Sequence, residues 1–174
     1  MKSNTMPSNQ LGKIVSDYEN TDLDSLDLPS ERSLVIAREC SISISSDLPR
    51  AKSSAMALGL DNVNQIDPIL RESSLPYLEL EFPKLTFFSW AIIFRLAWFC
   101  GFSKNGESIK EAKSRAKLGA EKLERLAKEN SSVLNVGHGI MNRLVVKELK
   151  SRGWQAKECT GEKYWSYTVL ENEI

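Results

Sequence analysis

Leu134-Asn135-Val136-Gly137-His138-Gly139-Ile140 is the stretch that decides how this chain folds. A short apolar run, typical of a buried strand, ends in Gly-His-Gly, and helix-forming residues follow at once. The stretch contains His138, the only histidine among the 174 residues. This pattern predicts a strand over about 132–136, a tight turn at His138 and a helix from Ile140 to about Arg152.

A second stretch of the same kind lies earlier in the chain. Ser41-Ile42-Ser43-Ile44-Ser45 alternates polar and apolar residues, which predicts a short strand. Ser46 or Asp47 can cap a following helix, and Pro49 is tolerated in its first turn. The first turn of that helix also carries Arg50. The chain therefore has two predicted turns from a strand into a helix, one with Arg50 and one with His138.

Strands that alternate with helices predict an α/β domain with a largely parallel sheet, whose ligands bind at the C-terminal ends of the strands. Arg50 and His138 are both expected there, at helix N-termini, where free N–H groups and the helix dipole favour anions. Gly137 and Gly139 would let the backbone approach a ligand closely. If the two turns are neighbours, they form a phosphate site. From the residues alone, a structural role for His138 and simple exposure of Arg50 stay open.

The aromatic stretch over residues 85–102 is close to the lower length limit of a membrane span. Arg95 lies near its middle, however, and a charge there is costly in lipid. The stretch therefore predicts an amphipathic or buried helix and no membrane span. Ser108 with Glu111 forms a capping box that opens the next helix. Glu107 stands where a P-loop needs lysine, which excludes a nucleotide-phosphate loop.

The overall charge excludes a general attraction to nucleic acid. Lysine plus arginine and aspartate plus glutamate both count 23, so any anion site must be local. The three cysteines have no metal-ligand spacing, which predicts reduced thiols and no metal site. The N-terminal residues have no apolar core of a signal peptide, which favours a cytoplasmic protein.

Four segments, in this order, resemble the motifs of the histidine phosphatase superfamily, the phosphoglycerate mutase-like fold. They are Ser46-Asp47-Leu48-Pro49-Arg50-Ala51, Leu70-Arg71-Glu72, Gly106-Glu107-Ser108 followed by Arg115, and Val136-Gly137-His138-Gly139. The resemblance covers roughly residues 26–170. It implies a three-layer α/β/α sandwich with a mostly parallel sheet. Residues 1–20 would form a loop and short helix, residues 21–174 a single domain, and residues 73–105 a lid inserted in it.

The resemblance also implies a set of roles for a phosphoric monoester hydrolase or phosphomutase. Arg50, His138 and Gly139 would bind the phosphate, and His138 would neutralise its charge. Glu72 would protonate the leaving oxygen and later help to activate the acceptor. The expected ligand is a phosphorylated small molecule or another phosphoester, with no cofactor and no metal. Such chemistry rests on positioning and electrostatic stabilisation.

One family motif has no counterpart in this chain. The nucleophilic histidine of the family lies on the first strand in an Arg-His-Gly motif, and no Arg-His-Gly occurs here. One hypothesis is a phosphatase that lacks its first strand and is inactive as written. The alternative is a pseudoenzyme that binds a phosphate ligand or a protein partner. Strand edges left open by the missing strand favour association, so a homodimer is a possible state.

Overall fold

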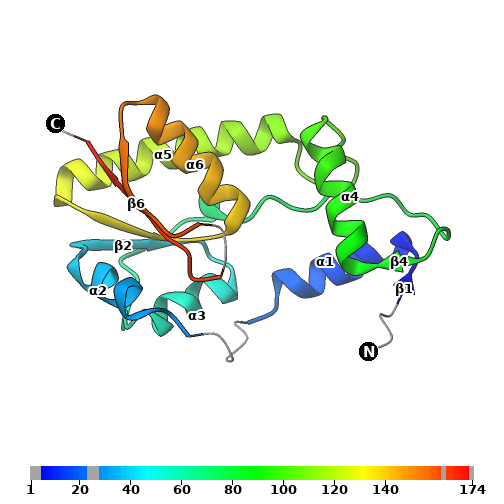
Figure 1. Ribbon diagram of the computed structural model, residues 1–174, viewed down its shortest axis with the longest axis horizontal. Helices are drawn as coiled ribbons and strands as arrows, with labels where there is room; N and C mark the ends of the chain where they lie inside the picture. Colours follow the sequence, from blue (N-terminus) through cyan, green and yellow to red (C-terminus); the bar gives the residue numbers. More distant parts are fainter. Residues whose placement is uncertain (1–4, 23–27, 162–163, 173–174) are drawn as a thin grey trace. The chain divides into compact units, whose positions relative to one another are not determined.

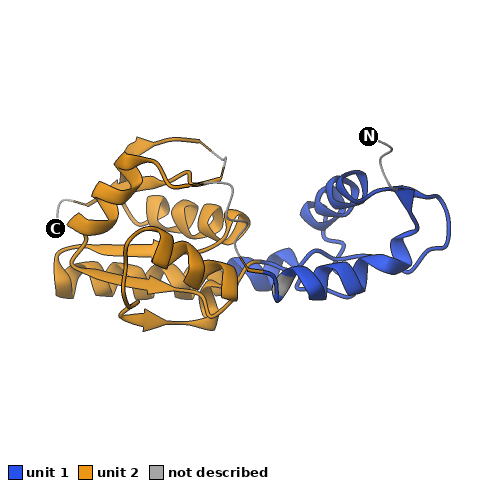
Figure 2. Cartoon of the chain, turned by 90° about the horizontal axis from the view of Figure 1, so that it is seen from below, with its two compact units in different colours: residues 1–21, 73–114 blue, residues 22–72, 115–174 orange. Residues whose placement is uncertain are grey.

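The computed structural model describes residues 5–22, 28–161 and 164–172. The chain divides into two compact units, which Figure 2 shows in blue and orange. Unit 1 comprises residues 1–21 and 73–114, and unit 2 comprises residues 22–72 and 115–174. The assignment of residues 73–105 as a lid within one domain stays a prediction.

Unit 2 is built on a parallel sheet of three strands in the order β3-β2-β5. Its elements are α2 (Glu31–Glu39), β2 (Ile42–Ser45), α3 (Pro49–Ala57), β3 (Gln65–Ile66), the 3-10 turn η2 (Pro68–Leu70), most of α5 (Ile109–Asn130), β5 (Val133–Val136), α6 (Gly139–Ser151), β6 (Gln155–Cys159) and β7 (Thr168–Glu171). The pairing of β2 with β5 runs from Ile42 opposite Val133 to Ser45 opposite Val136. These two strands are direct neighbours over their full length.

Helices cover both faces of this sheet, with α5 and α6 on one side and α2 and α3 on the other (Figure 1). Side chains along the strands therefore point in turn to one helix layer and to the other. Ile44 packs in a cluster with α5 and α6 residues such as Leu123 and Met141, whereas Val136 packs with Ala37 and Ala55 from α2 and α3. Period-two alternation places successive side chains on opposite faces. The predicted α/β/α sandwich with a parallel sheet is therefore confirmed.

The C-terminal part of unit 2 contains a strand that the sequence pattern did not predict. This strand is β6, which pairs antiparallel with β7. Four of the five β6 residues are exposed, so β6 lacks the apolar alternation that marks a half-buried strand. Its pairing with β7, and not an apolar pattern in its own sequence, shows that β6 is a strand.

Unit 1 is organised around an aromatic helix. Its elements are β1 (Thr5–Met6), the 3-10 turn η1 (Ser8–Gln10), α1 (Leu11–Glu19), β4 (Leu85–Thr86), α4 (Phe87–Phe99) and the start of α5. Leu11 packs against Leu75, Trp90 and Phe94 in the core of the unit. The predicted amphipathic or buried helix within residues 85–102 is thus α4, and the side chain of its N-cap residue Thr86 accepts a hydrogen bond from the amide of Ser89.

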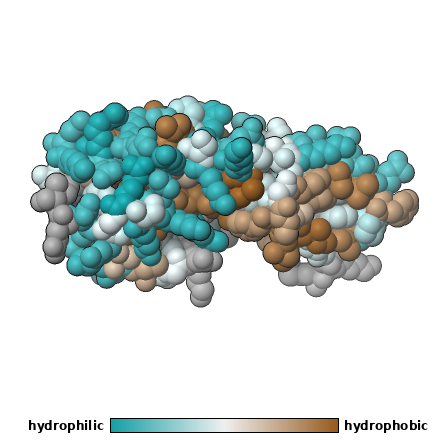
Figure 3. Space-filling model, turned by 90° about the horizontal axis from the view of Figure 1, so that it is seen from above, coloured by the Kyte–Doolittle hydropathy of each residue, from teal (hydrophilic) through white to brown (hydrophobic). Residues whose placement is uncertain are grey.

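The apolar residues of α4 are divided between two faces. Trp90, Phe94 and Trp98 are buried, while five other large apolar side chains of the helix are exposed: Phe88, Ile92, Ile93, Leu96 and Phe99. Figure 3 shows hydrophobic colouring gathered more on unit 1 than on unit 2. Within the described part of the chain, no helix has both the length and the apolar character of a membrane span.

The long helix α5 begins as the capping box predicts. The amide of Glu111 donates to Ser108 Oγ at 3.2 Å, and the amide of Ser108 donates to the Glu111 carboxylate at 2.8 Å. These reciprocal bonds satisfy amides that have no partner inside the helix. The hydrogen bonds to Ser108 also lower the pKa of the Glu111 carboxyl.

Candidate functional site

The direct pairing of β2 with β5 brings the two strand-to-helix turns together. Ser46 follows β2, His138 follows β5, and Ser46 Oγ lies 2.6 Å from His138 Nε2. Ser46 has no exposed surface, and His138 is 7% exposed. The two turns are therefore neighbours in unit 2, as the phosphate-site hypothesis requires.

Two arginines, Arg50 and Arg115, place positive charge near the His138 ring. Burial is the main cause that lowers the pKa of His138 from 6.5 to about 4, and the positive charges of Arg50 and Arg115 lower it further. The nearby Asp47 carboxylate acts weakly in the opposite direction. Because the pKa lies well below 7, the ring is neutral at physiological pH, and the cationic charge of the cluster resides on the two guanidinium groups.

Arg50 is held in place by its position in the fold. It is the second residue of α3 and is only 8% exposed. A buried arginine at a helix N-terminus is unusual, because burying its charge requires partners. Its planar guanidinium carries five N–H donors in a geometry that fits phosphate oxygens.

Arg115 fixes the chain segment that leads to Glu72. From α5, its Nη1 donates to the carbonyl of Ile69 at 2.8 Å and to the carbonyl of Arg71 at 2.7 Å. Its Nη2 reaches the carbonyl of Glu72 at 3.5 Å. A single side chain thereby positions the backbone on which the predicted acid lies and adds a charge near His138.

Glu72 itself lies at the N-terminus of α6. Its Oε2 accepts from the amide of Ile140 at 3.2 Å, and its Oε1 accepts from the amide of Met141 at 3.0 Å. A Cβ placed on Gly139 would lie 3.9 Å from Glu72 Oε2, an ordinary contact distance. The carboxylate thus occupies the anion-binding end of the helix, where free amides and the helix dipole favour negative charge.

The predicted helix cap at Ser46 or Asp47 is wrong. The N-cap residue of α3 is Leu48, and no side chain caps this end. Asp47 instead pairs with Arg71, whose Nε donates to Asp47 Oδ1 at 2.6 Å. This hydrogen bond lowers the pKa of the Asp47 carboxyl. Ser46 turns toward His138, a partner 92 residues away that no local pattern reveals.

Of the two glycines that flank His138, Gly137 has a clear packing reason. A Cβ on Gly137 would approach Asn142 Oδ1 to 2.6 Å, and this oxygen accepts from Asn135 Nδ2 at 3.0 Å. Only glycine leaves room for this amide pair across the turn. The close approach that was predicted for a ligand is, at Gly137, an approach of a side chain of α6.

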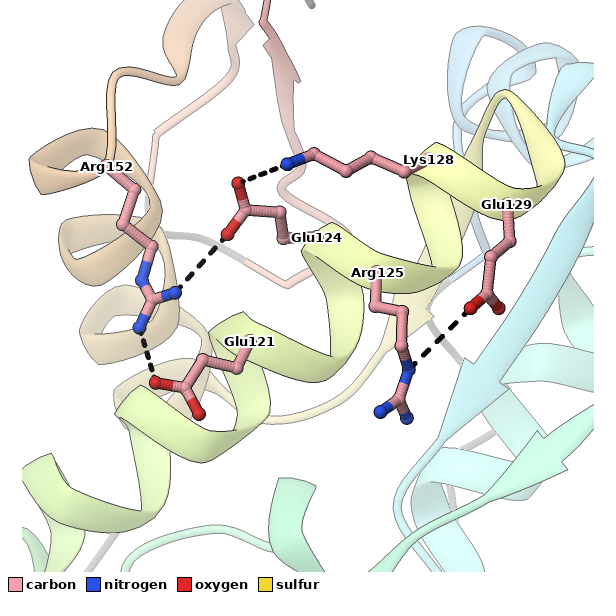
Figure 4. Close-up of a pocket in the computed structure, with 6 residues that line it drawn as sticks. All are labelled: Glu121, Glu124, Arg125, Lys128, Glu129 and Arg152. Carbon is pink, nitrogen blue, oxygen red and sulfur yellow. Dashed lines mark hydrogen bonds and ion pairs between the residues drawn. The ribbon is translucent and has the colours of Figure 1, made fainter.

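A separate surface pocket between α5 and α6 carries charged residues only, and Figure 4 shows their mutual ion pairs. Arg152 contacts Glu121 at 2.8 Å and Glu124 at 3.3 Å. These ion pairs join the C-terminal end of α6 to α5. Among the described residues, no group of three or more His, Cys, Asp or Glu could hold a metal ion.

The structure brings Arg50, Glu72, His138 and Gly139 into one part of unit 2, and it adds two residues to them. The local sequence pattern predicts Ser46 only as a helix cap, and Arg115 enters only through the resemblance to the family motif. The charge of Arg115 and its spacing after Ser108 could have suggested a site role. The contact of Ser46 with His138 had no such signal. The chemical roles of all these residues stay predictions.

Comparisons with known proteins give one family. The profile of the histidine phosphatase superfamily (branch 1) matches residues 35–173. No curated protein matches the sequence. Among solved structures, a mycobacterial glucosyl-3-phosphoglycerate phosphatase in complex with inorganic phosphate is similar, with a TM-score of 0.52, 19% identity, and coverage of 88% of this chain and 87% of the other.

Two further structures have weaker likeness. The product of an open reading frame of Mycobacterium tuberculosis has a TM-score of 0.48 and 18% identity, with 90% of each chain covered. The native mycobacterial glucosyl-3-phosphoglycerate phosphatase has a TM-score of 0.49 and 26% identity, with 73% of this chain and 68% of the other covered. The profile match spans most of the sequence and includes the turns that carry Arg50 and His138. The chain therefore belongs to the histidine phosphatase superfamily.

Proposed function

We propose that unit 2 binds the phosphoryl group of a phosphorylated small molecule at Arg50, Arg115 and His138. The observation that carries this proposal is the buried His138 at the turn after β5, with the buried Arg50 and the Arg115 guanidinium close enough for their positive charges to act on its ring. Two arginines around a neutral donor offer charge and hydrogen bonds to a dianion. Arginine–phosphate pairs are among the stronger charge-assisted interactions in proteins.

We further propose that these 174 residues bind a phosphoester without turning it over. Transfer through a phosphohistidine needs a nucleophilic histidine in addition to the supporting one. His138 is the only histidine in the sequence, and its Nε2 is engaged by Ser46. The remaining residues could orient an ester and stabilise its charge, which lowers a barrier only when a nucleophile is present.

Glu72 could act as a proton donor only if its present hydrogen bonds changed. Both of its oxygens accept amide hydrogen bonds at the start of α6. A carboxyl group that protonates a leaving oxygen must release at least one of these bonds and hold a proton instead. Binding of a phosphoester near Arg50 could supply the negative charge that favours this change.

A pseudoenzyme, in which recognition of a phosphorylated ligand or a protein partner is the whole function of the site and not the remnant of a phosphatase, is the second candidate function. The observation that supports it is the direct pairing of β2 with β5. Because the two strands are neighbours, the turns that follow them are in contact through Ser46 and His138. In this arrangement, strands within the described residues already bring together the turns that carry Arg50 and His138. Such a module would use the same site for recognition of a phosphorylated ligand.

The test uses inorganic phosphate as the probe, with titration followed by calorimetry. We expect saturable binding that Arg50→Ala weakens by at least about tenfold, which corresponds to roughly 1.4 kcal/mol. Arg38→Ala is the matched control, because Arg38 is an exposed arginine in unit 2 and its loss should leave the affinity unchanged. Equal weakening by both variants, or no binding to the wild type, would contradict the proposal.

Turnover is tested separately with p-nitrophenyl phosphate. We expect negligible hydrolysis by the wild type and by His138→Ala. Sustained hydrolysis that persists in His138→Ala and disappears in Arg50→Ala would show a nucleophile other than histidine. That result would overturn the non-catalytic part of the proposal but retain the binding site.

A further inference from the structure

The Ser46 hydroxyl is buried completely, and its hydrogen-bond partners define the direction of its proton. Among the residues that the structure describes, Ser46 Oγ has two partners, the Leu48 amide at 3.4 Å and His138 Nε2 at 2.6 Å. The amide of Leu48 can only donate, so it uses a lone pair of the hydroxyl. The hydroxyl proton of a buried serine needs an acceptor. His138 Nε2 is the acceptor within reach.

We infer that Ser46 is a positioning residue that holds His138 as the neutral tautomer with its proton on Nδ1. An imidazole nitrogen that accepts a hydrogen bond cannot carry a proton, so the ring proton must lie on the other nitrogen. This inference rests on the geometry of the β2 and β5 turns. It deepens the proposed function, because the tautomer decides which ring atom can donate to a phosphoryl oxygen.

The remaining ring nitrogen is available for that purpose. Among the described residues, the His138 ring has one hydrogen-bond partner, Ser46 at Nε2. Nδ1–H is then the only N–H that the neutral ring can offer to a ligand. The backbone from which the ring projects is also fixed, because His138 is the N-cap residue of α6 and its carbonyl accepts from the amide of Asn142 at 2.8 Å.

The neighbouring serine provides a matched control. Ser45 is as completely buried as Ser46, but its Oγ donates to the carbonyl of Ser46 at 2.9 Å. Its hydroxyl therefore satisfies a backbone carbonyl at the same place in the sheet and, within the described part of the chain, has no hydrogen bond to the imidazole. A merely structural role for Ser46 would make Ser45→Ala and Ser46→Ala equivalent in their effect on the ring.

The measurement is the long-range correlation of ring carbon-bound protons with the two ring nitrogens in nitrogen-15-labelled protein without a histidine tag. The single histidine gives the spectrum of one ring. At pH 7 we expect the wild type to show a protonated Nδ1 and an unprotonated Nε2. Ser46→Ala should shift the population toward the Nε2–H tautomer, whereas Ser45→Ala and the hydroxyl-retaining Ser46→Thr should match the wild type.

A wild-type spectrum with a protonated Nε2 would overturn the inference, and this arm needs no variant to fold. An unchanged tautomer in folded Ser46→Ala would overturn it as well. Phosphate is then added to the same samples. If the wild type has the Nδ1–H tautomer but phosphate causes no change in the ring signals, the inference stands and the proposed function fails. If Nδ1–H moves on saturation, both are supported.

Discussion

The carboxylate of Glu72 caps the N-terminus of α6, with its Oε1 3.0 Å from the amide of Met141. Glu72 precedes α6 by more than sixty residues of sequence, so this cap joins two distant parts of unit 2. The carboxylate supplies negative charge at the positive end of the helix dipole and satisfies amides that lack helical partners. The same carboxylate is the predicted acid of the family site. Its role as a helix cap favours the ionised form, whereas a role as an acid requires the protonated form.

Glu72→Gln should lower the free energy of unfolding of unit 2 by about 1 kcal/mol, because the neutral amide keeps one acceptor and loses the charge. The measurement is denaturant unfolding followed by circular dichroism. Glu79→Gln is the control, because it removes the same charge from an exposed position of unit 1. A stability of Glu72→Gln equal to that of the control would show that the cap contributes nothing.

Protonation of His138 should make unit 2 less stable as the pH falls. The folded-state pKa is about 4 and the ordinary value is 6.5. Between these two values the unfolded chain takes up a proton at this ring and the folded chain does not. The stabilisation is therefore complete above about pH 6.5 and is lost as the pH falls to about 4, by at most about 3 kcal/mol.

The check compares the pH dependence of the unfolding free energy in the wild type and in His138→Asn, which cannot titrate there. Carboxylates contribute equally to both proteins, so the difference isolates His138. The difference in unfolding free energy between the two proteins should change with pH between about 4 and 6.5 and stay constant above that range. A difference that is flat with pH would contradict the lowered pKa, as would a direct ring titration with a midpoint near 6.5.

Arg115→Ala should destabilise unit 2 and loosen the segment before Glu72. The substitution leaves the carbonyls of Ile69 and Arg71 without their charged donor, and hydrogen bonds to charged groups contribute about 1.5–3 kcal/mol each at most. We expect a loss of about 2 kcal/mol and faster amide exchange at the start of α6. Lys117→Ala, which removes an exposed charge from the same helix, should change stability by less than about 0.5 kcal/mol.

Trp98 and Phe99 are adjacent in α4 and should respond very differently to truncation. Trp98 is fully buried and its Nε1 donates to the carbonyl of Glu107 at 2.7 Å, whereas Phe99 is 55% exposed. Trp98→Ala should lower the free energy of unfolding of unit 1 by about 3–5 kcal/mol. Phe99→Ala should cost less than about 1 kcal/mol. Equal losses by thermal unfolding would mean that Phe99 is covered in solution.

The parts of the fold that follow from local patterns were predictable. The alternation over Ile42–Ser45, the apolar run of β5 and the capping box at Ser108 each specify their element through neighbouring residues, and all three elements are present. β6 was missed because an exposed strand has no apolar signature. β6 forms because it pairs with β7, and residues within β6 alone do not indicate this pairing.

The candidate site was predictable as a collection of residues but not as an arrangement. Arg50 and His138 could be placed at helix N-termini because strand-to-helix turns have local signatures. The contact between Ser46 and His138 depends on the register of β2 against β5. The Glu72 cap depends on how η2 approaches α6. Neither relation leaves a trace in the spacing of residues along the chain.

The pairing of β2 with β5 also has a consequence for the order of folding. Ser46 and His138 are 92 positions apart, so a long loop must close before their side chains meet. Parallel pairing over such a separation is entropically costly and slow compared with helix formation. The imidazole therefore enters its buried environment only when the sheet of unit 2 has assembled. Its resonance is a reporter of that late event, and no fragment that contains only one of the two strands can reproduce it.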